Sequence, residues 1–434
     1  MAKKKNRNRN NNGNQQNPNA EHQRFASTST AVSGTFSKNN INSMTEERLK
    51  STLQDASSNA VNIANFSEAM KNVNGIYKQV IRYLSTLCTY DHTIYPVMEN
   101  PIEFTEDPSA LKLAFAQTAI VVDRYNPKFF LPIFTDKIFT KGVTYQYKLE
   151  DSKSIAYQEF PLNYCRISYM EEGVYRYQFD VTKVSDASYA SFPKEIQNAV
   201  DQYKKGQTDK LIEGKWHQVS DKGVAFTMDT EALNQGGMAL PPLASMLIDT
   251  IKVENAKNQM ETTEDLDNTK IIHSKIETDD RGRPLMELNV VQEYHNAMKR
   301  NLPSGSVAVT NPFETKALTL NGTGKDGKFA LLDKVTDLLY KGSGVSGQLF
   351  ADDNSSSQAL ERSIQVDCQW LYSYLLPMFN NYYNYELKKA GKKGTQWKMK
   401  LLPISNFDRK EAIKTSKDQL TYGCLLYTSP SPRD

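Results

Sequence analysis

The sequence of 434 residues has little of what thiol, metal and membrane chemistry requires. It contains four scattered cysteines, with no CxxC pair and no histidine at ligand spacing: Cys88, Cys165, Cys368 and Cys424. This pattern argues against a disulfide framework and against a structural zinc site. No apolar run approaches the roughly 18 residues of a membrane span, and no apolar segment follows Lys3–Lys5 to make a secretory signal. We therefore expect no metal, no membrane partner and a protein that stays in the cytosol where it is made.

A large charge of either sign is also absent. The net charge of +3 is too small to argue for DNA binding across the whole surface. Residues 1–20 nevertheless contain five basic residues, eight asparagines and no acid. Residues 1–42 are polar and nearly free of large aliphatic side chains, which predicts a disordered basic tail. Such a tail either contacts nucleic acid or only solubilises the protein, and the second role is the simpler one.

The part of the chain that we expect to be ordered begins with residues at helical spacing. Ser43 and Glu46 lie three residues apart, as in a capping box at the start of a helix. After Ser67, apolar residues recur every three or four positions, which predicts an amphipathic helix packed on a core. These residues are Met70, Val73, Tyr77, Val80, Leu84 and Leu87.

From residue 143 the apolar period changes to two. Val143–Leu149, Cys165–Tyr169 and Tyr175–Val181 alternate apolar with polar residues. Such alternation predicts antiparallel strands with one face on the core and one face in solvent. Glu171–Gly173 predicts a hairpin turn between the last two of these strands. Trp216–Met228, interrupted by a polar turn, predicts a second hairpin.

The second half of the chain returns to helices, the first of them opened by Pro241 and Pro242. The expected elements are a helix at 243–260, a strand at 271–276, a helix at 287–300, a strand at 307–309 and a helix at 329–340. Asp279–Pro284 is expected to form a turn. Together with the alternating strands, these helices predict an α+β fold.

The longest helix is expected at about 357–389. Pro377 lies inside it and should kink it. Its apolar residues form one unbroken seam at helical spacing. They are Leu360, Ile364, Cys368, Leu371, Leu375, Met378, Tyr382 and Tyr385.

Two short motifs resemble nucleotide-binding sites, but the residues and elements around them do not fit such a site. Gly342–Gly347 matches GxGxxG, but a helix rather than a strand is expected before it. Gly324 and Lys325 resemble the end of a phosphate-binding loop. Thr319 and Asp326, however, replace the first glycine and the hydroxyl residue that would bind magnesium. The chain is therefore not expected to be an ATPase of the phosphate-binding-loop type.

Candidate acid–base groups fail as well. Asp352-Asp353 and Asp279-Asp280 are adjacent acids in polar loops, which is typical of solvated turns. His217 and His295 have no partner acid or nucleophile at a recognisable spacing. We therefore expect no enzyme and no cofactor.

One stretch carries a family resemblance. Leu339–Met378 reads LYKGSGVSGQLFADDNSSSQALERSIQVDCQWLYSYLLPM, a helix, a GV segment, a polar loop and a long kinked helix. In this order of elements the chain resembles the portal proteins of tailed bacteriophages, especially those of phages that infect Gram-positive hosts. Phe129–Lys137, Pro284–His295 and Ile404–Ile413 are also similar, and the order of elements agrees from about residue 45 to 423.

The resemblance implies a structural role. Portal subunits form a ring of about a dozen copies at one capsid vertex. The ring is the conduit for packaging and ejection of double-stranded DNA, which it contacts without regard to sequence. It also docks the packaging terminase and later the head–tail adaptor, and it contacts capsid and scaffolding proteins. The expected location is the virion, with assembly in the bacterial host cytoplasm.

The resemblance also implies a division of the chain. Residues 43–240 would form an outer wing of helices and antiparallel strands, and 266–320 a small α/β clip. Residues 241–265 and 321–345 would be the two stem helices. Residues 346–423 would hold a tunnel loop, the long kinked helix and the return to the wing.

The same resemblance implies the residues that face DNA. The tunnel loop would present Gly347, Gln348, Asp352, Asp353, Asn354, Ser355, Ser356 and Ser357. The stem would line the channel with Lys325, Lys328, Lys334 and Lys341. DNA must slide past these groups, so small polar side chains and weak attraction to its backbone suit the task.

Two features depart from the family. Residues 424–434, CLLYTSPSPRD, share no pattern with the preceding chain and are expected to be translated adaptor sequence. The carboxy-terminal crown of the family would then be absent. The basic tail keeps a second class of function open, a nucleic-acid-binding or other virion assembly protein without a ring.

Overall fold

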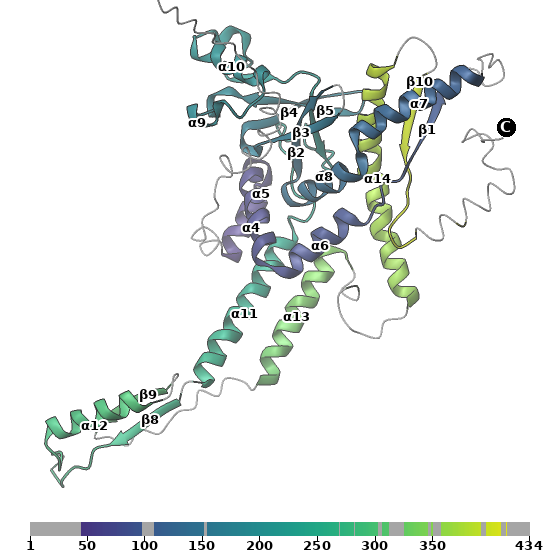
Figure 1. The fold of residues 1–434 in the computed structure, drawn as a ribbon. Helices are drawn as coiled ribbons and strands as arrows, with labels where there is room; N and C mark the ends of the chain where they lie inside the picture. The colour runs from purple at the N-terminus through teal and green to yellow at the C-terminus, as the bar shows by residue number, and fades with distance from the viewer. Residues whose placement is uncertain are drawn as a thin grey trace, which may run out of the picture.

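The fold combines a body, two long projecting helices and a small distal unit (Figure 1). The computed structural model describes residues 45–97, 108–151, 154–268, 270–281, 283–302, 306–311, 325–345, 349, 357–391, 396–408 and 414. Helices and antiparallel sheets share the body, so the predicted α+β class is confirmed. The helices α11 (Met246–Asn268) and α13 (Lys325–Ser343) run side by side away from the body and are called the stem below.

The body contains most of the elements. Its helices are α4 (Glu46–Gln54), α5 (Ala56–Val73), α6 (Gly75–Thr86), α7 (Pro108–Tyr125), α8 (Pro127–Lys141), α9 (Asp186–Tyr189), α10 (Lys194–Lys204) and α14 (Ser357–Ala390). Its strands are β1 (His92–Val97), β2 (Val143–Glu150), β3 (Ile155–Phe160), β4 (Cys165–Glu171), β5 (Val174–Asp180), β6 (Trp216–Gln218), β7 (Gly223–Thr227) and β10 (Gln396–Leu401).

The main sheet is antiparallel and has the order β3-β2-β7-β5-β4, with β6 also paired to β5. The hairpin predicted between β4 and β5 is confirmed, with Glu171 opposite Val174. The second predicted hairpin is wrong, because β6 and β7 do not pair with each other. Both pair with β5, His217 opposite Phe179 and Ala225 opposite Tyr175, so the two short strands follow one another along one edge.

The prediction of a solvent-exposed sheet face is wrong for β2 and β5, whereas β4 alternates buried with partly exposed residues from Cys165 to Ser168 as predicted. Every residue of β5 is buried, including the polar Arg176, Gln178 and Asp180. Helices explain this, since α8 and α14 cover one face and α10 covers the other. Lys148 of β2 and Arg176 of β5 therefore face α14 instead of water.

The helices before the sheet differ from the prediction at their caps. Thr45, not Ser43, caps α4, and its Oγ1 accepts from the Arg48 N–H at 3.3 Å. The single helix predicted after Ser67 is two helices that meet at Asn74. The Asn74 side chain caps α6 by accepting from the Tyr77 N–H at 2.7 Å. The break turns Val73 outward, where it is 52% exposed.

The stem begins three residues later than predicted. Leu243 and Ala244 lie in hydrogen-bonded turns after Pro241, and α11 starts only at Met246. The proline pair therefore precedes the helix by a turn instead of opening it. Gly342 allows α13 to approach α11 closely, because a Cβ at this position would lie 3.0 Å from a carboxylate oxygen of Asp249.

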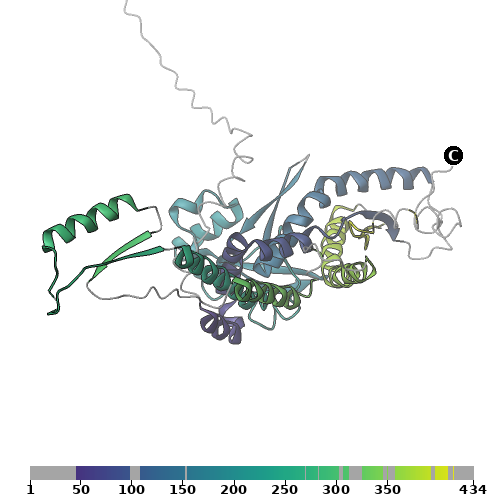
Figure 2. The same ribbon diagram turned by 90° about the horizontal axis from the view of Figure 1, so that it is seen from below.

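The distal unit, called the terminal unit below, consists of β8 (Lys270–Lys275), α12 (Leu288–Asn301) and β9 (Ser306–Asn311). The predicted helix and both strands are confirmed. The strands pair in parallel, with Lys270 opposite Ser306, and α12 packs beside β9. Figures 1 and 2 show the unit at the end of the stem, well away from the body.

A small second sheet in the body was not predicted. β1 and β10 pair antiparallel, with His92 opposite Leu401. The outer N–H groups of β10 donate to α14, from Met399 to Asn384 and from Leu401 to Asn380, both at 2.8 Å. Two asparagines one helical turn apart thus accept the hydrogen bonds of the edge N–H groups that a third strand would otherwise accept.

The long helix α14 confirms the predicted seam. Its residues Ile364, Cys368, Leu371, Leu375, Met378 and Tyr382 are buried. Pro377 lies inside the helix, whose axis changes direction in Figure 1. The wing, stem and clip boundaries proposed from the resemblance remain predictions.

Leu371→Ala should lower the free energy of unfolding by about 2–5 kcal/mol, because Leu371 is fully buried in this seam and its removal leaves a cavity. Tyr374→Ala is the matched control on the same helix, since Tyr374 is 50% exposed. Chemical denaturation of both variants measures the difference. A loss below about half a kilocalorie at Leu371 would contradict the buried seam.

Candidate functional site

The stem carries the described part of the predicted channel lining. Lys334 and Lys341 are exposed on α13, and Lys341 pairs with Asp337 at 2.5 Å. Leu331 and Leu338 share this face at helical spacing and are 45% and 43% exposed. The lysines therefore lie on a mixed apolar and basic surface, opposite the buried Leu339 that packs in the core. Lys325 and Lys328 belong to α13, but their side chains lie outside the described residues.

The predicted tunnel loop lies outside the described residues almost entirely. This applies to Gly347, Gln348, Asp352, Asp353, Asn354, Ser355 and Ser356. Ser357 is the first residue of α14, and only its backbone is described. The structure therefore does not test this part of the predicted site.

The other stem helix has a surface that the sequence reading missed. Asn255, Asn258, Gln259 and Thr262 follow one another at i, i+3, i+4 and i+7 on α11 and line a shallow hollow. None of them is charged. The side-chain amides of Asn255 and Asn258 can donate to phosphate oxygens without adding a net charge, whereas the Thr262 hydroxyl already donates to the Asn258 carbonyl at 2.8 Å. A search for unbroken runs of uncharged polar residues at helical spacing could have found this surface.

A buried ion pair joins α14 to the main sheet. Lys148 of β2 donates to Glu386 of α14, and the Tyr125 hydroxyl donates to the same carboxylate oxygen at 2.7 Å. The side chains of Lys148 and Glu386 are only 7% and 2% exposed. Burial, and after it the charge of Glu386, raise the pKa of Tyr125 well above its ordinary value. The hydroxyl therefore stays protonated and keeps donating to the carboxylate.

A second buried cation lies close by on β5. Arg176 stacks on the Tyr385 ring of α14, with 4.5 Å between the guanidinium carbon and the ring centroid. It also donates to Glu171 at 3.2 Å and to the Gly223 carbonyl at 2.9 Å. The guanidinium thus links the hairpin, strand β7 and the helix. Charge pairing and stacking together account for its burial in a face that the sequence pattern assigned to solvent.

The hairpin turn packs directly on α14. Gly173 has φ +78° and lies so close to Asn381 that a Cβ would approach its side-chain nitrogen to 2.4 Å. Beside this contact, Lys388 pairs with Glu172 at 2.6 Å. Glycine is required here both by the left-handed backbone and by the close approach. The turn therefore fixes the carboxy-terminal half of α14.

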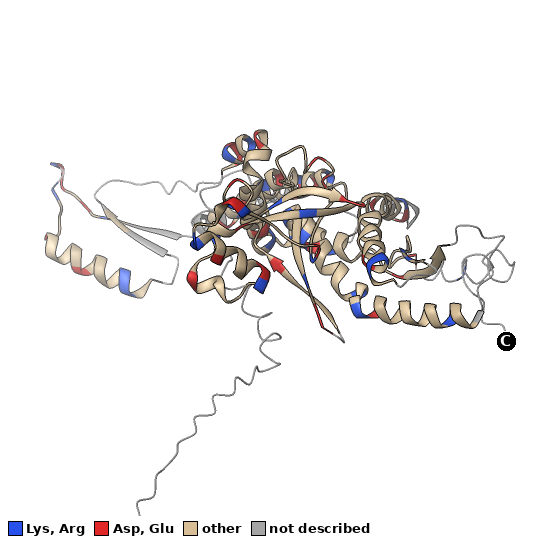
Figure 3. Ribbon diagram, turned by 90° about the horizontal axis from the view of Figure 1, so that it is seen from above, with Lys and Arg blue, Asp and Glu red and all other residues tan. Residues whose placement is uncertain are grey.

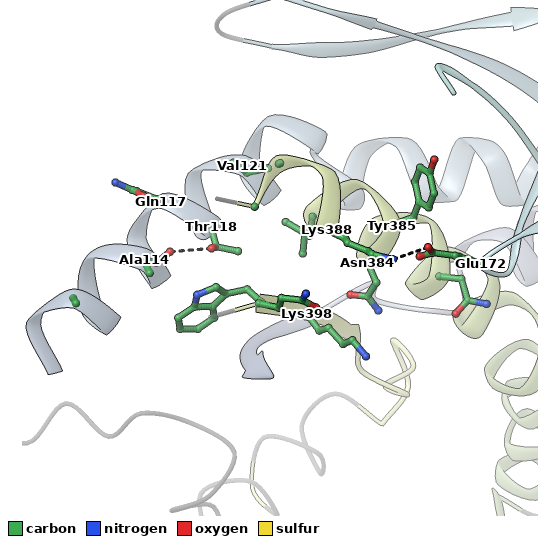
Figure 4. Close-up of a pocket in the computed structure, with 16 residues that line it drawn as sticks. Ala114, Gln117, Thr118, Val121, Glu172, Asn384, Tyr385, Lys388 and Lys398 are labelled. Atoms are coloured by element: carbon green, nitrogen blue, oxygen red, sulfur yellow. Dashed lines mark hydrogen bonds and ion pairs between the residues drawn. The ribbon is translucent and has the colours of Figure 1, made fainter. Parts of the chain in front are cut away.

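A groove of about 1020 Å³ lies between α7, the end of α14 and β10 (Figure 4). Figure 4 shows Gln117 and Thr118 on α7, and Asn384 and Lys388 on α14. The Lys388–Glu172 ion pair closes one end. Amide and apolar side chains predominate, and among the described lining residues there is no His or Cys and no pair of carboxylates that could act as nucleophile and base.

Two carboxyl groups in the body have shifted pKa values. Burial opposes ionisation of Glu195, but hydrogen bonds from His217, Ser220 and Tyr147 outweigh it and lower its pKa to about 2. Burial raises the pKa of Asp367 to about 6, against the hydrogen bond from Tyr83. Both groups tie secondary-structure elements together.

The histidine predictions need one correction. His217 does have an acid partner, since its Nε2 lies 3.2 Å from Glu195 across the sheet and α10. The sequence could not reveal this pair, because Glu195 on α10 and His217 on β6 lie 22 residues apart. His295 contacts Thr310 at 2.9 Å, and Asp279 accepts from the Arg281 and Arg283 N–H groups in the predicted turn.

Along the described ranges, no group of three or more His, Cys, Asp or Glu side chains could hold a metal ion. In the same residues, no helix is both long and apolar enough to cross a membrane.

Lys148→Met should destabilise the protein by about 3–5 kcal/mol, because the Glu386 charge would remain buried without its partner. Adding Glu386→Leu should recover much of this loss, because the Met–Leu pair leaves no buried charge without a partner. Lys341→Met is the control: its exposed pair with Asp337 should be worth about 0–1 kcal/mol. Denaturant unfolding of the four proteins measures these values, and equal effects of the two lysine variants would contradict the role of the buried pair.

Comparison with known proteins gives similarity to solved structures alone. No protein-family model matches the chain, and no curated protein matches it. A chain in the virion of a native gene transfer agent (GTA) particle is 12% identical, covering 86% of this chain and 91% of that chain, with a TM-score of 0.41. A chain in the neck of an empty GTA particle is 11% identical over the same shares, with a TM-score of 0.42. We draw no functional assignment from similarities of this size.

Proposed function

We propose that this chain is a structural portal subunit, one copy of a ring that forms the conduit for double-stranded DNA at a capsid vertex. The observation that carries the proposal is the pair α11 and α13, which runs away from the body to a separate terminal unit. A ring of such subunits would place parallel stems around a common axis and leave a passage between them. The sequence resemblance of Leu339–Met378 to portal proteins supports the same conclusion independently.

Exposed apolar surface on α7 supports a multi-subunit assembly. Leu113 and Ile120 are each 62% exposed, although Val122 and Tyr125 of the same helix are buried. From Ser109 to Val122 the only charged residue is Lys112. A helix that is apolar on both sides normally lies inside a larger structure. Neighbouring subunits would supply that cover in a ring.

The stem surfaces suit a passage for DNA. The uncharged strip of Asn255, Asn258 and Thr262 offers hydrogen bonds but no net attraction to phosphates. Lys334 and Lys341 add a limited basic character, and Lys341 is already paired with Asp337. Weak contacts let the duplex slide, whereas a strongly basic wall would hold it. We therefore keep the proposed DNA-facing role of α13 and add α11 to it.

The remaining parts of the proposal follow from the portal role. The ring would dock the packaging terminase during filling and the head–tail adaptor afterwards, and it would contact capsid and scaffolding proteins. It would be a virion component assembled in the host cytoplasm. It would carry out no catalysis itself and would need no cofactor.

Purified protein should form particles many times the 49.2 kDa mass of one chain. Light scattering measures the mass, and negative-stain images should show closed rings. We expect this because apolar surface on α7 stays uncovered in one copy. A stable monomer at micromolar concentration would contradict the ring and favour the alternative of a nucleic-acid-binding or other assembly protein.

Asp352→Lys combined with Asp353→Lys should leave ring formation intact but impair DNA packaging. The two changes add four charge units per subunit, repeated around one circle if the loop faces the channel. Attraction to phosphates would then rise, and higher salt should rescue packaging in part. Glu47→Lys with Asp55→Lys, at two exposed positions on the body, adds the same four charge units and is the control. Normal packaging by the first variant would remove this loop from the channel.

A further inference from the structure

Asp367 of α14 is a buried acid without a cationic partner. Its carboxylate lies between α14 and α6, where one oxygen accepts from the Tyr83 hydroxyl at 2.9 Å. Among the described residues, no Lys, Arg or His forms an ion pair with it. The basic residues next to this contact in sequence, Arg82 and Arg362, are exposed. Acidic and basic positions are interspersed over the body in Figure 3, so the missing cation does not reflect a scarcity of basic residues.

The two other acids that are buried in the described body are better compensated. Glu386 pairs with Lys148. Asp180 accepts from the backbone N–H of Thr182 at 3.0 Å and from the hydroxyl of the same residue at 2.6 Å. Asp367 has one neutral donor and no backbone N–H. An ionised carboxyl group that is removed from water with so little compensation is costly, whereas the protonated form costs much less.

Asp367 also lies where α14 first becomes buried against the body. None of the described residues from Leu360 to Ser363 is buried, and Figure 1 shows this end of the helix extending beyond the body. Ile364, Asp367 and Cys368 are the first buried residues in the described part of the helix. Separation of this turn from α6 would expose the carboxylate to water. Local opening is therefore favoured by the ionised form of the acid.

The titratable groups around Asp367 supply no positive charge. They come from α14, from α6 and the chain just after it, and from the segment that follows β10. Burial raises the pKa of both thiols and both phenols among them, so these four groups stay neutral near pH 7. The fifth group is an acid, whose carboxylate accepts from the Ser405 hydroxyl at 2.6 Å. The five groups are Cys368, Tyr372, Tyr83, Cys88 and Asp408.

We propose that Asp367 is a proton-controlled latch between α14 and α6, closed when its carboxyl group is protonated and loosened when the group is ionised. The latch belongs to the single subunit, so it goes beyond the proposed ring and does not depend on it. Burial raises the pKa of Asp367 to about 6, against the hydrogen bond from Tyr83. The closed contact therefore binds the proton more tightly than the open one. Its stability is complete below the ordinary pKa of an aspartic acid and is lost as the pH rises through about 6.

Hydrogen exchange of the full-length protein tests the latch. From about pH 5 to about pH 7, the equilibrium constant for opening of residues 360–371 should rise by roughly tenfold, after correction for the intrinsic exchange rate. Above about pH 7 it should level off, because the carboxyl group is then ionised in both states. These residues should also exchange faster than β7, since the opening is local. Exchange at the same rate as β7 would mean that the turn opens only with the whole body, and it would overturn the latch.

Three variants identify the group that titrates. Asp367→Asn keeps an acceptor for Tyr83 but cannot ionise, so its opening constant at about pH 7 should not exceed that of the wild type at about pH 5. Tyr83→Phe removes the donor that stabilises the ionised form, so the midpoint should move to higher pH. Asp408→Asn is the matched control. It removes the neighbouring acid and should leave the roughly tenfold change in place.

The wild type alone carries the first test, so the latch can be refuted even where a variant fails to fold. An opening constant that stays the same from about pH 5 to about pH 7 would overturn it. An equal change in Asp367→Asn would overturn it as well, because another group would then be responsible. Neither result bears on ring formation, which light scattering measures separately.

Discussion

The arrangement of the body depends on the contact between the polar face of its main sheet and α14. Lys148 and Glu386 form the buried ion pair, Tyr125 donates to the same carboxylate, and Arg176 stacks on Tyr385. A buried charge without its partner is costly, so these groups tolerate only one placement of the helix on the sheet. The apolar seam of α14 supplies most of the buried area, and the charged groups select its register.

Contacts with the same body set the direction of the stem. Asn74, at the corner between α5 and α6, caps α6 and also donates to Glu254 of α11 at 2.7 Å. The close approach at Gly342 then holds α13 against α11. Because the stem is anchored at one end only, small changes at this corner would move the terminal unit over a long distance.

Local periodicity predicted most of the elements, and contacts distant in sequence account for the errors. The seam of α14, the β4–β5 hairpin and the helix and strands of the terminal unit follow from spacing within a few residues. The alternation in β5 suggested water on the Arg176 side, because the sequence does not show that α14 would cover it. The pairing of β1 with β10 and that of His217 with Glu195 could not be read from spacing. The uncharged polar surface of Asn255, Asn258, Gln259 and Thr262 on α11 has no charge pattern or motif that would mark it in the sequence.

The pairing of β1 with β10 has a consequence for synthesis. β1 ends at Val97 and β10 begins at Gln396, so the sheet joins segments from opposite ends of the described chain. On the ribosome, β1 emerges long before its partner, and α14 finds its asparagine contacts only when β10 follows. The stem and the terminal unit are therefore a loop that is closed last. A chain cut short before Gln396 would lack β10 and would leave Asn380 and Asn384 of α14 without the strand N–H groups that they accept from, so the small sheet can close only when translation is nearly complete.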